Sequence, residues 1–392
     1  MKNKCFLGGL LLIIIHSCRL DNPPKTGLNK EGVVIEINVP INYDNTIQVD
    51  SLFESIDIIP LETTEKSLIS NAKKIIIYND KKIYIQDFIN SLYVFDINGK
   101  FIQKIGKQGR GPKEYIQLAG FDVDNHGNIY ILDYHKILKF DPDGNFEFSK
   151  NLNFSTKKFQ CWPEQLLVAN DGYFIWSGSL GIKENKDNRH FAMYYITNDY
   201  KMDKGFFPIK HKLMSSLCRF RRYDNLYNID PTFGNDTIFS IIEDEVVPRY
   251  YINFGKRALK KKIPDEYNSF SEFKSEIAAN HSFSPINFTE TDDWIYFSFS
   301  HNFKYYNAFY SKVKKKTYVS AISPESFPKW IDSSWGNSLI ILVDPVNIIG
   351  NSNSNWFDSF RIKNNALEEK FKSVSLTDNP VVFVCKMKKF KS

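Results

Sequence analysis

The chain has 392 residues, a net charge of +6, and 6 Trp, 21 Tyr and 33 Phe. So many aromatic side chains suit sheet-on-sheet packing better than a helical bundle, and the charge is too small for this length to indicate a class of partner. Of the five cysteines, Cys5 and Cys18 lie near the start, and Cys161, Cys218 and Cys385 are odd in number and far apart. This spacing indicates neither a disulfide framework nor a zinc site.

The N-terminal segment has the pattern of an export signal. Two lysines precede an apolar run, residues 5–15, that is too short to span a bilayer. The run ends in Ile15-His16-Ser17-Cys18, which resembles a bacterial lipobox, with an unusual His before the Ser. We therefore expect a lipoprotein signal peptide at residues 1–17, lipid attachment to Cys18 and an extended tether at residues 18–30. The alternative is an ordinary secretory signal in which the cysteine occurs by chance.

The next elements in chain order are two early strands, residues 31–40 and 55–61, and then a clear repeat. Ile83-Tyr84-Ile85 recurs 46 residues later as Ile129-Tyr130-Ile131, and Asn98-Gly99 recurs 45 residues later as Asp143-Gly144. Short β-branched and aromatic runs with this period are typical of propeller blades. We expect two-residue hairpins at the two Gly turns, with positive φ at both central residues. One blade buries too little to fold alone, so the repeat predicts further blades around an axis.

The repeat predicts an all-β fold, a six-bladed β-propeller over residues 31–392. Removal of the signal leaves 375 residues, about 62 for each of six blades. The blades are expected at residues 71–105, 118–150, 172–197, 236–255, 294–311 and 338–384. One early strand should pair with the C-terminal strand at residues 381–386 and so close the ring. One short helical insertion is expected at Pro264 to Ser282, where apolar residues have helical spacing.

Several segments carry a further pattern, namely residues 60–63, 95–102, 105–115 and 129–133. They resemble bacterial six-bladed β-propeller lipoproteins with NHL-like repeats. Residues 248–256 look like the Pro-x-Tyr-x-x-Asp-Phe-Gly-Lys segment of that family, with Asn253 where Asp is usual. The resemblance implies the propeller fold and a cell-envelope location, as an outer-membrane lipoprotein facing the periplasm or the cell surface. It implies no particular reaction.

A glycine-rich segment, residues 106–112, is a candidate ligand-binding loop. Its three glycines could let backbone N–H groups approach an anion, but the spacing is neither that of a P-loop nor that of a dinucleotide fingerprint. We expect this loop to cross from the outer strand of one blade to the inner strand of the next. If the crossing lies at a ring face, Arg110, Glu114 and Tyr115 are candidate ligand contacts.

Other patterns have simpler structural interpretations. The segment from Asp122 to Asp133 partly matches a calcium loop, but a hairpin fits better, so we predict no cofactor, with calcium as the alternative. Asp87 and Asp133 hold equivalent repeat positions, which indicates a structural role at strand ends. Four histidines could join an axial site but are expected in loops: His126, His135, His211 and His301. Basic clusters, including residues 219–222, are expected at solvated turns rather than on a nucleic-acid surface.

These features predict a membrane-tethered protein that binds an unknown protein, peptide or glycan at one ring face. It is expected to bind no nucleic acid and to have no catalytic activity of its own. The alternative is an extracytoplasmic propeller enzyme, a metal-assisted hydrolase or lyase with an axial active site. Three or more Asp, Glu or His side chains meeting at one end of the axis would favour the enzyme, and an aromatic or neutral lining would favour binding.

Overall fold

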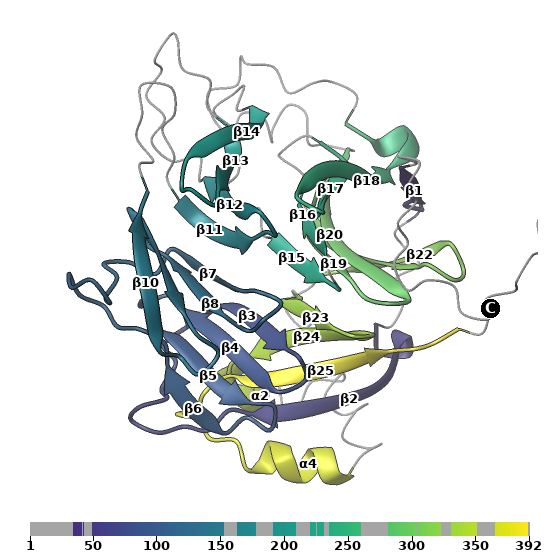
Figure 1. Ribbon diagram of the computed structural model, residues 1–392. Coiled ribbons are helices and arrows are strands. Elements are labelled where there is room, and N and C mark those ends of the chain that lie inside the picture. The colour runs from purple at the N-terminus through teal and green to yellow at the C-terminus, as the bar shows by residue number, and fades with distance from the viewer. Residues whose placement is uncertain are drawn as a thin grey trace, which may run out of the picture.

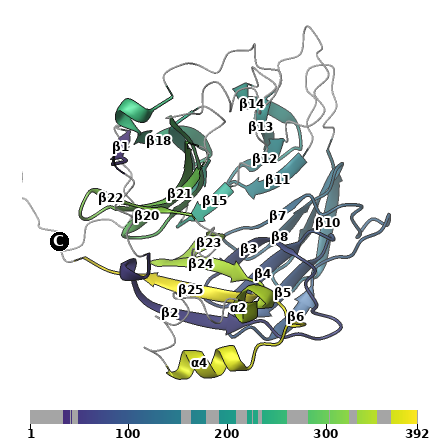
Figure 2. The same cartoon turned by 180° about the vertical axis from the view of Figure 1, so that it is seen from behind.

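The chain forms six sheets arranged around a common axis (Figures 1 and 2). The computed structural model describes residues 34–40, 42, 49–152, 163–177, 191–208, 220–224, 226–230, 235–259, 281–302, 304–322, 331–350 and 365–390. In five of the sheets, four antiparallel strands follow one another in the chain. In the sixth, a strand from near the N-terminus completes three strands from the C-terminal part of the chain. One of the first five sheets carries a further strand at its edge. The predicted all-β, six-bladed propeller is confirmed.

The first three blades follow the chain in order. Blade 1 contains β3 (Ala72–Tyr78), β4 (Lys82–Asp87), β5 (Leu92–Asp96) and β6 (Phe101–Lys104). Blade 2 contains β7 (Gly120–Val123), β8 (Ile129–Leu132), β9 (Lys136–Phe140) and β10 (Phe146–Asn151). Blade 3 contains β11 (Pro163–Val168), β12 (Gly172–Ser177), β13 (Phe191–Thr197) and β14 (Met202–Pro208). In each blade the first strand lies nearest the axis, as Figure 1 shows.

Blades 4 and 5 follow in the same way. Blade 4 contains β15 (Phe220–Tyr223), β16 (Leu226–Ile229), β17 (Thr237–Ile242) and β18 (Glu245–Asn253), and the 3-10 helix η2 (Gly255–Arg257) follows it. Blade 5 contains β19 (Ser282–Glu290), β20 (Trp294–His301), β21 (Lys304–Ser311) and β22 (Lys316–Ala321). The helix predicted at Pro264 to Ser282 lies outside the described residues up to residue 280, and Ser282 already belongs to β19.

Blade 6 joins the two ends of the chain. It contains β23 (Ser333–Trp335), β24 (Ser338–Val343), β25 (Val381–Met387) and, as its outer strand, β2 (Phe53–Pro60), which follows the 3-10 helix η1 (Val49–Leu52). Strand β2 is antiparallel to β25, with Ile58 opposite Phe383. This pairing confirms the predicted closure of the ring, which removes an exposed sheet edge.

Two short α-helices that the sequence analysis did not predict lie between β24 and β25. They are α2 (Pro345–Gly350) and α4 (Asn365–Lys372). Helix α4 lies beside β2 on the outside of the ring (Figure 1), where Lys370 Nζ is 2.7 Å from Asp57 Oδ1. The insertion therefore covers the outer strand of blade 6. No helix in the described ranges is long and apolar enough to cross a bilayer.

Strand β1 (Ile35–Asn38) joins a different blade from β2. It pairs in parallel with β18 at the outer edge of blade 4. Asn253 Nδ2 donates to Glu36 Oε1 at 2.8 Å and to Asn38 Oδ1 at 3.0 Å. An aspartate, usual at this position in the resembling family, has no amide to donate and would place its charge against Glu36. Asn253 therefore fits the pairing of this edge with β1.

The glycine turns correct one prediction. Gly99 N donates to Asp96 O at 3.0 Å, and Asp96 N donates to Lys100 O at 2.8 Å. Asp96 Oδ1 also accepts hydrogen bonds from the N–H groups of Asn98 and Lys100. Gly99 has φ +86°, whereas Asn98 does not adopt a positive φ. This is a three-residue loop with a type I turn and a left-handed Gly, not the predicted two-residue hairpin, because the Asp side chain stabilises the longer loop.

The hydrophobic core is divided among the blade junctions. Each of six buried clusters joins residues of two neighbouring blades, and one of these clusters joins blade 6 to blade 1. Ile75 and Ile83 face blade 6, whereas Ile76 and Tyr84 face blade 2. Successive side chains of a strand point to opposite faces, so both faces of these strands are apolar. This explains why the blade strands appear in the sequence as continuous apolar runs.

Candidate functional site

A cavity of about 720 Å³ lies at the axis. Residues of the inner strands β3, β7, β11, β15 and β23 line it, together with the segments next to those strands. Small-molecule sites typically enclose about 300–1,000 Å³. The cavity is therefore large enough for a small ligand. Asp292, between β19 and β20, also lines it, so all six blades contribute to its wall.

The wall combines aromatic and charged side chains. The described aromatic lining residues are Phe88, Tyr134, Phe220, Tyr223, Tyr227 and Trp335. The basic ones are Lys73, Lys74, Arg221 and Arg222, and the acidic ones are Asp122, Glu164, Asp224, Asp292 and Asp332. Charges of both signs nearly balance, so this part of the wall presents no strong single-sign field.

Strand β15 supplies two arginines to the cavity wall. Arg221 is only 5% exposed, and its guanidinium donates to Asp332 O and, at 3.3 Å, to Asn287 Oδ1. Arg222 donates to Val123 O at 3.0 Å and to Asn125 Oδ1 at 2.5 Å. The prediction that this basic cluster lies at a solvated turn is therefore wrong for both residues. A guanidinium carries five donors in a planar fork, which lets β15 bind blades 2, 5 and 6 together.

Two lysines of β3 reach across to blade 2. Lys73 Nζ donates to Ala119 O at 2.9 Å, and Lys74 Nζ donates to Phe121 O at 2.6 Å. On the neighbouring wall, burial raises the pKa of Glu164, and the positive charge of Lys73 partly opposes this rise. The lysines therefore connect blades 1 and 2 at the cavity and also set its local charge.

Asp122 of β7 is a buried acid with one oxygen unused. It is 1% exposed, and its Oδ2 accepts from Val168 N at 2.8 Å and from Tyr227 Oη at 3.0 Å. Burial, and next the charge of Asp122, raise the pKa of Tyr227 well above its usual value, so this hydroxyl stays protonated and donates. No described group donates to Asp122 Oδ1. A buried acceptor without a donor costs about 1–3 kcal/mol, so this arrangement calls for an explanation.

The candidate calcium loop is a hairpin between β7 and β8. Asp124 Oδ1 accepts from the N–H groups of His126 and Asn128, and Gly127 takes the positive φ of the turn. Within the residues that the structure describes, no group of three or more His, Cys, Asp or Glu could hold a metal ion. The absence of a cofactor stays a prediction.

The glycine-rich loop does cross from the outer strand β6 to the inner strand β7, as predicted. Glu114 Oε2 accepts from Gly111 N at 2.8 Å, and Lys107 Nζ lies 3.0 Å from Glu114 Oε1. Tyr115 is 1% exposed, and its hydroxyl donates to Asn90 O. Arg110 is exposed. The role of these residues as ligand contacts stays a prediction.

None of Arg110, Glu114 and Tyr115 is among the described residues that line the axial cavity, but Gln117 of the same crossing segment is. The backbone N–H of Gln117 donates to Asp133 Oδ1, and Asp133 Oδ2 accepts from Ile116 N. In blade 1, Asp87 Oδ1 likewise accepts from the N–H groups of Ile89 and Ser91. Asp87 and Asp133 therefore hold connecting segments at strand ends, which agrees with the structural role predicted for them.

The histidines and cysteines lie apart from the axis where the structure describes them. No histidine is among the described lining residues of the cavity, and His211 lies outside the described residues. Cys385 is a buried free thiol whose pKa is raised by burial. Cys18, Cys161 and Cys218 lie outside the described residues, so the lipid attachment predicted at Cys18 stays a prediction.

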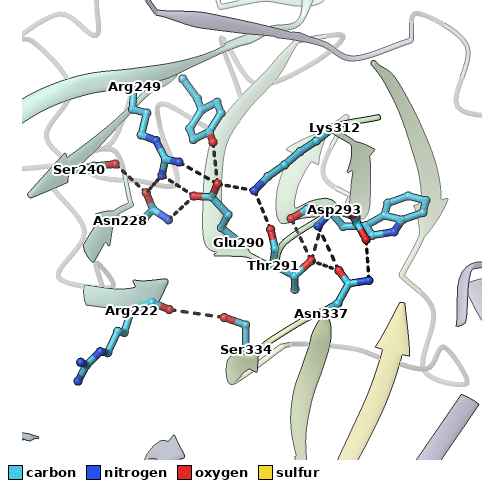
Figure 3. Close-up of polar contacts among 12 residues, drawn as sticks. Arg222, Asn228, Ser240, Arg249, Glu290, Thr291, Asp293, Lys312, Ser334 and Asn337 are labelled. Atoms are coloured by element: carbon cyan, nitrogen blue, oxygen red, sulfur yellow. Dashed lines mark hydrogen bonds and ion pairs between the residues drawn. The ribbon is translucent and has the colours of Figure 1, made fainter. Parts of the chain in front are cut away.

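Near the cavity, a buried ionic network joins blades 4 and 5 (Figure 3). Glu290 of β19 accepts from Arg249 at 2.5 and 3.0 Å, from Lys312 at 2.6 Å, from Tyr250 Oη at 2.8 Å and from Asn228 Nδ2 at 2.9 Å. Burial raises the pKa of Glu290, but Lys312 and Arg249 outweigh it and hold the pKa below its usual value.

This network was not predicted from the sequence. Its signal was a charged residue inside each of two apolar strands, Arg249 in β18 and Glu290 at the end of β19. A buried charge needs a partner, and the two strands belong to neighbouring blades, so the pair could have been proposed once the blades were ordered. Taken alone, neither charge shows from the sequence that it is buried.

The chain matches one family model and is similar to several solved structures. A family model described as a domain of unknown function matches residues 32–386, and no curated protein matches the chain in sequence. Among solved structures, a Bacteroides fragilis protein inferred to be exported is similar over 91% of this chain and 100% of its own, with 19% identity and a TM-score of 0.68. At this identity the likeness shows the fold alone.

Two further solved structures are more distant. The extracellular domain of an inferred one-component system from B. thetaiotaomicron has 12% identity and a TM-score of 0.34, over 74% of this chain and 31% of that one. The WD40 domain of Neurospora crassa Pan2 has 14% identity and a TM-score of 0.36, over 70% of this chain and 73% of that one.

Proposed function

We propose, from the premise that the chain belongs to the DUF4934 family of domains of unknown function, that it is an extracytoplasmic, lipid-anchored protein that binds a ligand in its axial cavity. The observation that carries this proposal is the cavity of about 720 Å³ with its aromatic and mixed-charge wall. Concave sites with apolar faces and a few fixed polar groups are those that bind small ligands.

The wall is held in place before any ligand arrives. Arg222 and the lysines of β3 hydrogen-bond to backbone carbonyls of blade 2, and Asp122 is held by two donors. Side chains fixed in this way lose little conformational entropy when a ligand binds, which favours affinity. Support for binding rather than catalysis comes from the aromatic lining, which was expected of a binding site. Five acidic residues also line the cavity, but among the described residues no three Asp, Glu, His or Cys gather in a group that could hold a metal ion.

The anchor is proposed from the sequence. The apolar run and the lipobox-like Ile15-His16-Ser17-Cys18 precede the matched family region. We expect Cys18→Ala to abolish incorporation of a radioactive fatty acid and to move the protein from the membrane to the soluble fraction. Equal incorporation by the variant and the parent would contradict the anchor, and cavity binding would be unaffected by that result.

Binding can be tested with a panel of probes. We suggest neutral oligosaccharides (cellohexaose, xylohexaose, mannohexaose) and tetrapeptides (tetra-alanine, tetralysine, tetraglutamate), measured by thermal shift and calorimetry. A ligand at about 100 times its Kd stabilises the folded protein by about 2.7 kcal/mol. At least one probe class should bind the parent protein.

A steric block then locates the site. Gln117 lines the cavity and is half-buried, so Gln117→Trp should fill part of it and weaken binding about tenfold or more. Gln103 of the outer strand β6 is not among the lining residues, so Gln103→Trp is the matched control. If no probe binds, or if the block leaves binding unchanged, the proposed function is wrong.

A further inference from the structure

We infer that one ring face docks on an anionic lipid surface through exposed apolar side chains and a basic loop of blades 1 and 2. This is the face at which the chain enters the inner strands β3 and β7. The segments that form its described part in these blades, residues 65–71, 88–91 and 105–119, are here called the entry face. The inference goes beyond the proposed function, since it concerns the outside of the ring.

Four large apolar side chains are exposed on the entry face. They are Leu68 (53% exposed), Phe88 (60%), Ile89 (58%) and Ile116 (49%). Phe88 also lines the axial cavity, whereas the other three are not among its described lining residues. These three therefore lie on the surface around the mouth of the cavity.

Hydrogen bonds hold the segments that carry these side chains side by side. Tyr93 Oη donates to Leu68 O at 2.6 Å and to Asp87 Oδ2 at 3.1 Å, which places Leu68 beside the turn that follows β4. In the same turn, Asn90 O accepts from Tyr115 Oη at 2.9 Å. The exposed side chains therefore form one patch across blades 1 and 2. Contiguous exposed apolar patches mark surfaces that bind proteins or membranes.

The loop that crosses from β6 to β7 makes this patch basic. Lys107, Arg110 and Lys113 are exposed. Glu114 is the one acidic residue of residues 105–119, and its Oε1 lies 3.0 Å from Lys107 Nζ. In residues 65–71 one acidic and one basic residue balance each other, and residues 88–91 carry no charge. Apolar side chains beside lysine and arginine favour binding to anionic lipids.

The opposite ring face is acidic. It contains the turns that join the first and second strands of the blades, at residues 79–81, 124–128, 169–171, 224, 291–293 and 336–337. These described residues include six aspartates and one lysine. An anionic surface attracts the entry face and repels this one, so charge orients the ring. Asp224 and Asp292 line the axial cavity, and a ring docked by its entry face would leave that end of the cavity open to a ligand.

The proposed anchor favours a lipid surface over a protein partner. Sixteen residues lie between Cys18 and Ile35, where β1 begins, and such a length spans at most about 50–60 Å. A compact domain of about 350 residues has a radius of gyration of about 20 Å. The entry face would therefore lie within reach of the membrane that holds the anchor.

The first test is independent of the anchor. It uses the chain without residues 1–18, which keeps all six blades, since β1 begins at Ile35. We expect this chain to co-sediment with vesicles of phosphatidylethanolamine and phosphatidylglycerol, and to bind phosphatidylcholine vesicles at least about tenfold more weakly. Added salt should weaken the binding. No co-sedimentation with the anionic vesicles, or equal binding to both kinds, would overturn the inference.

Matched variants then locate the contact. Val313, 36% exposed, lies in the turn between β21 and β22 of blade 5 and precedes three lysines. We expect Ile89→Ser to weaken binding to the anionic vesicles about fivefold, and Val313→Ser to weaken it less than about twofold. Equal losses in this pair, in variants with parent-like circular dichroism, would overturn the inference.

The basic loop has its own pair of variants. Arg110→Gln combined with Lys113→Gln should weaken binding about tenfold or more, because each cation near an anionic surface strengthens binding about fivefold. Lys314→Gln combined with Lys315→Gln, in the turn of blade 5, is the control and should change it less than about twofold. Equal losses here would also overturn the inference.

A protein partner is the other occupant that suits such a patch. A photoreactive amino acid in place of Ile116 would distinguish the two in cells, and adducts with lipid would support the inference. Adducts with a protein, together with no binding to anionic vesicles, would overturn it. The ligand probes report on the axial cavity and the vesicles on the entry face, so failure of one proposal is recognised separately from failure of the other.

Discussion

Replacement of Glu290 by Gln should destabilise the propeller strongly. The Glu290 side chain is 0% exposed and neutralises Arg249, which is 8% exposed, and Lys312, which is 23% exposed. Gln keeps the shape but removes the charge, so two cations stay between blades 4 and 5 without their counter-ion. Breaking a buried ion pair from one side costs about 3–5 kcal/mol.

This free energy can be converted to a melting temperature. Unfolding entropy is about 2.1 cal/mol/K per residue, or roughly 0.7 kcal/mol/K for about 350 propeller residues, so the loss corresponds to a fall of about 4–7 °C in Tm. Differential scanning calorimetry measures it. Asp199→Asn is the control, since its ion pair with Lys201 is 58% and 80% exposed on the two sides and an exposed pair should give no measurable shift.

The pH dependence gives a second readout of the same network. The pKa of Glu290 is lowered from 4.5 in the folded state, so the unfolded chain takes up this proton first on acidification. The stabilisation is therefore present above about pH 4.5 and is lost as the pH falls through the folded pKa. The Tm gap between parent and Glu290→Gln should narrow in acid. A gap below about 1 °C at neutral pH, or one that does not narrow in acid, would refute this reasoning.

Two further predictions concern stability and can be checked by urea unfolding. Burial raises the pKa of Asp236 to about 7, so its contribution to stability is lost as the pH rises from about 4 through about 7. Asp236→Asn should therefore gain about 2–3 kcal/mol more over the parent at about pH 8 than at about pH 5, and an equal gain at both would contradict the assignment. A Cβ on Gly99, at φ +86°, would lie 2.2 Å from Pro60 O, so Gly99→Ala should cost about 2–4 kcal/mol. Gly255, at φ +57° with open space around it, is the control, and Gly255→Ala should cost only about 1 kcal/mol; equal losses for the two glycines would show that the clash is relieved.

The blades could be predicted because their information is local. Ile83 and Ile129 lie in equivalent strands of two repeats, and a turn Gly follows 16 residues later in the first and 15 in the second, so the period predicts both the strands and the ring. The closure of β2 on β25 also followed, since a ring with an open edge would be exposed. The turn type did not follow, because the Asp96 carboxylate decides it through hydrogen bonds that the Asn-Gly pair alone does not reveal.

The axial site could not be read from local sequence. Its residues come from the inner strands of different blades, such as Lys73 and Lys74 of β3 and Arg221 and Arg222 of β15. Read alone, Phe220-Arg-Arg-Tyr223 is a basic cluster, and only the ring places it against the carbonyls of blade 2. Asp122 was considered as part of a calcium loop for the same reason, since Tyr227, the residue that reveals its orientation, lies 105 positions away.

The separate attachment of β1 has a mechanical consequence for an anchored protein. Between the proposed tether and the closing strand β2, the chain is first held by β18, where Val39 N donates to Asn253 O, and by blade 5, where Thr317 Oγ1 donates to Asn38 O. Tension transmitted from the lipid would have to separate β1 from β18 before it reached the pairing of β2 with β25 that closes the ring. The outer edge of blade 4 would thus protect the closure of the ring from force applied at the proposed anchor.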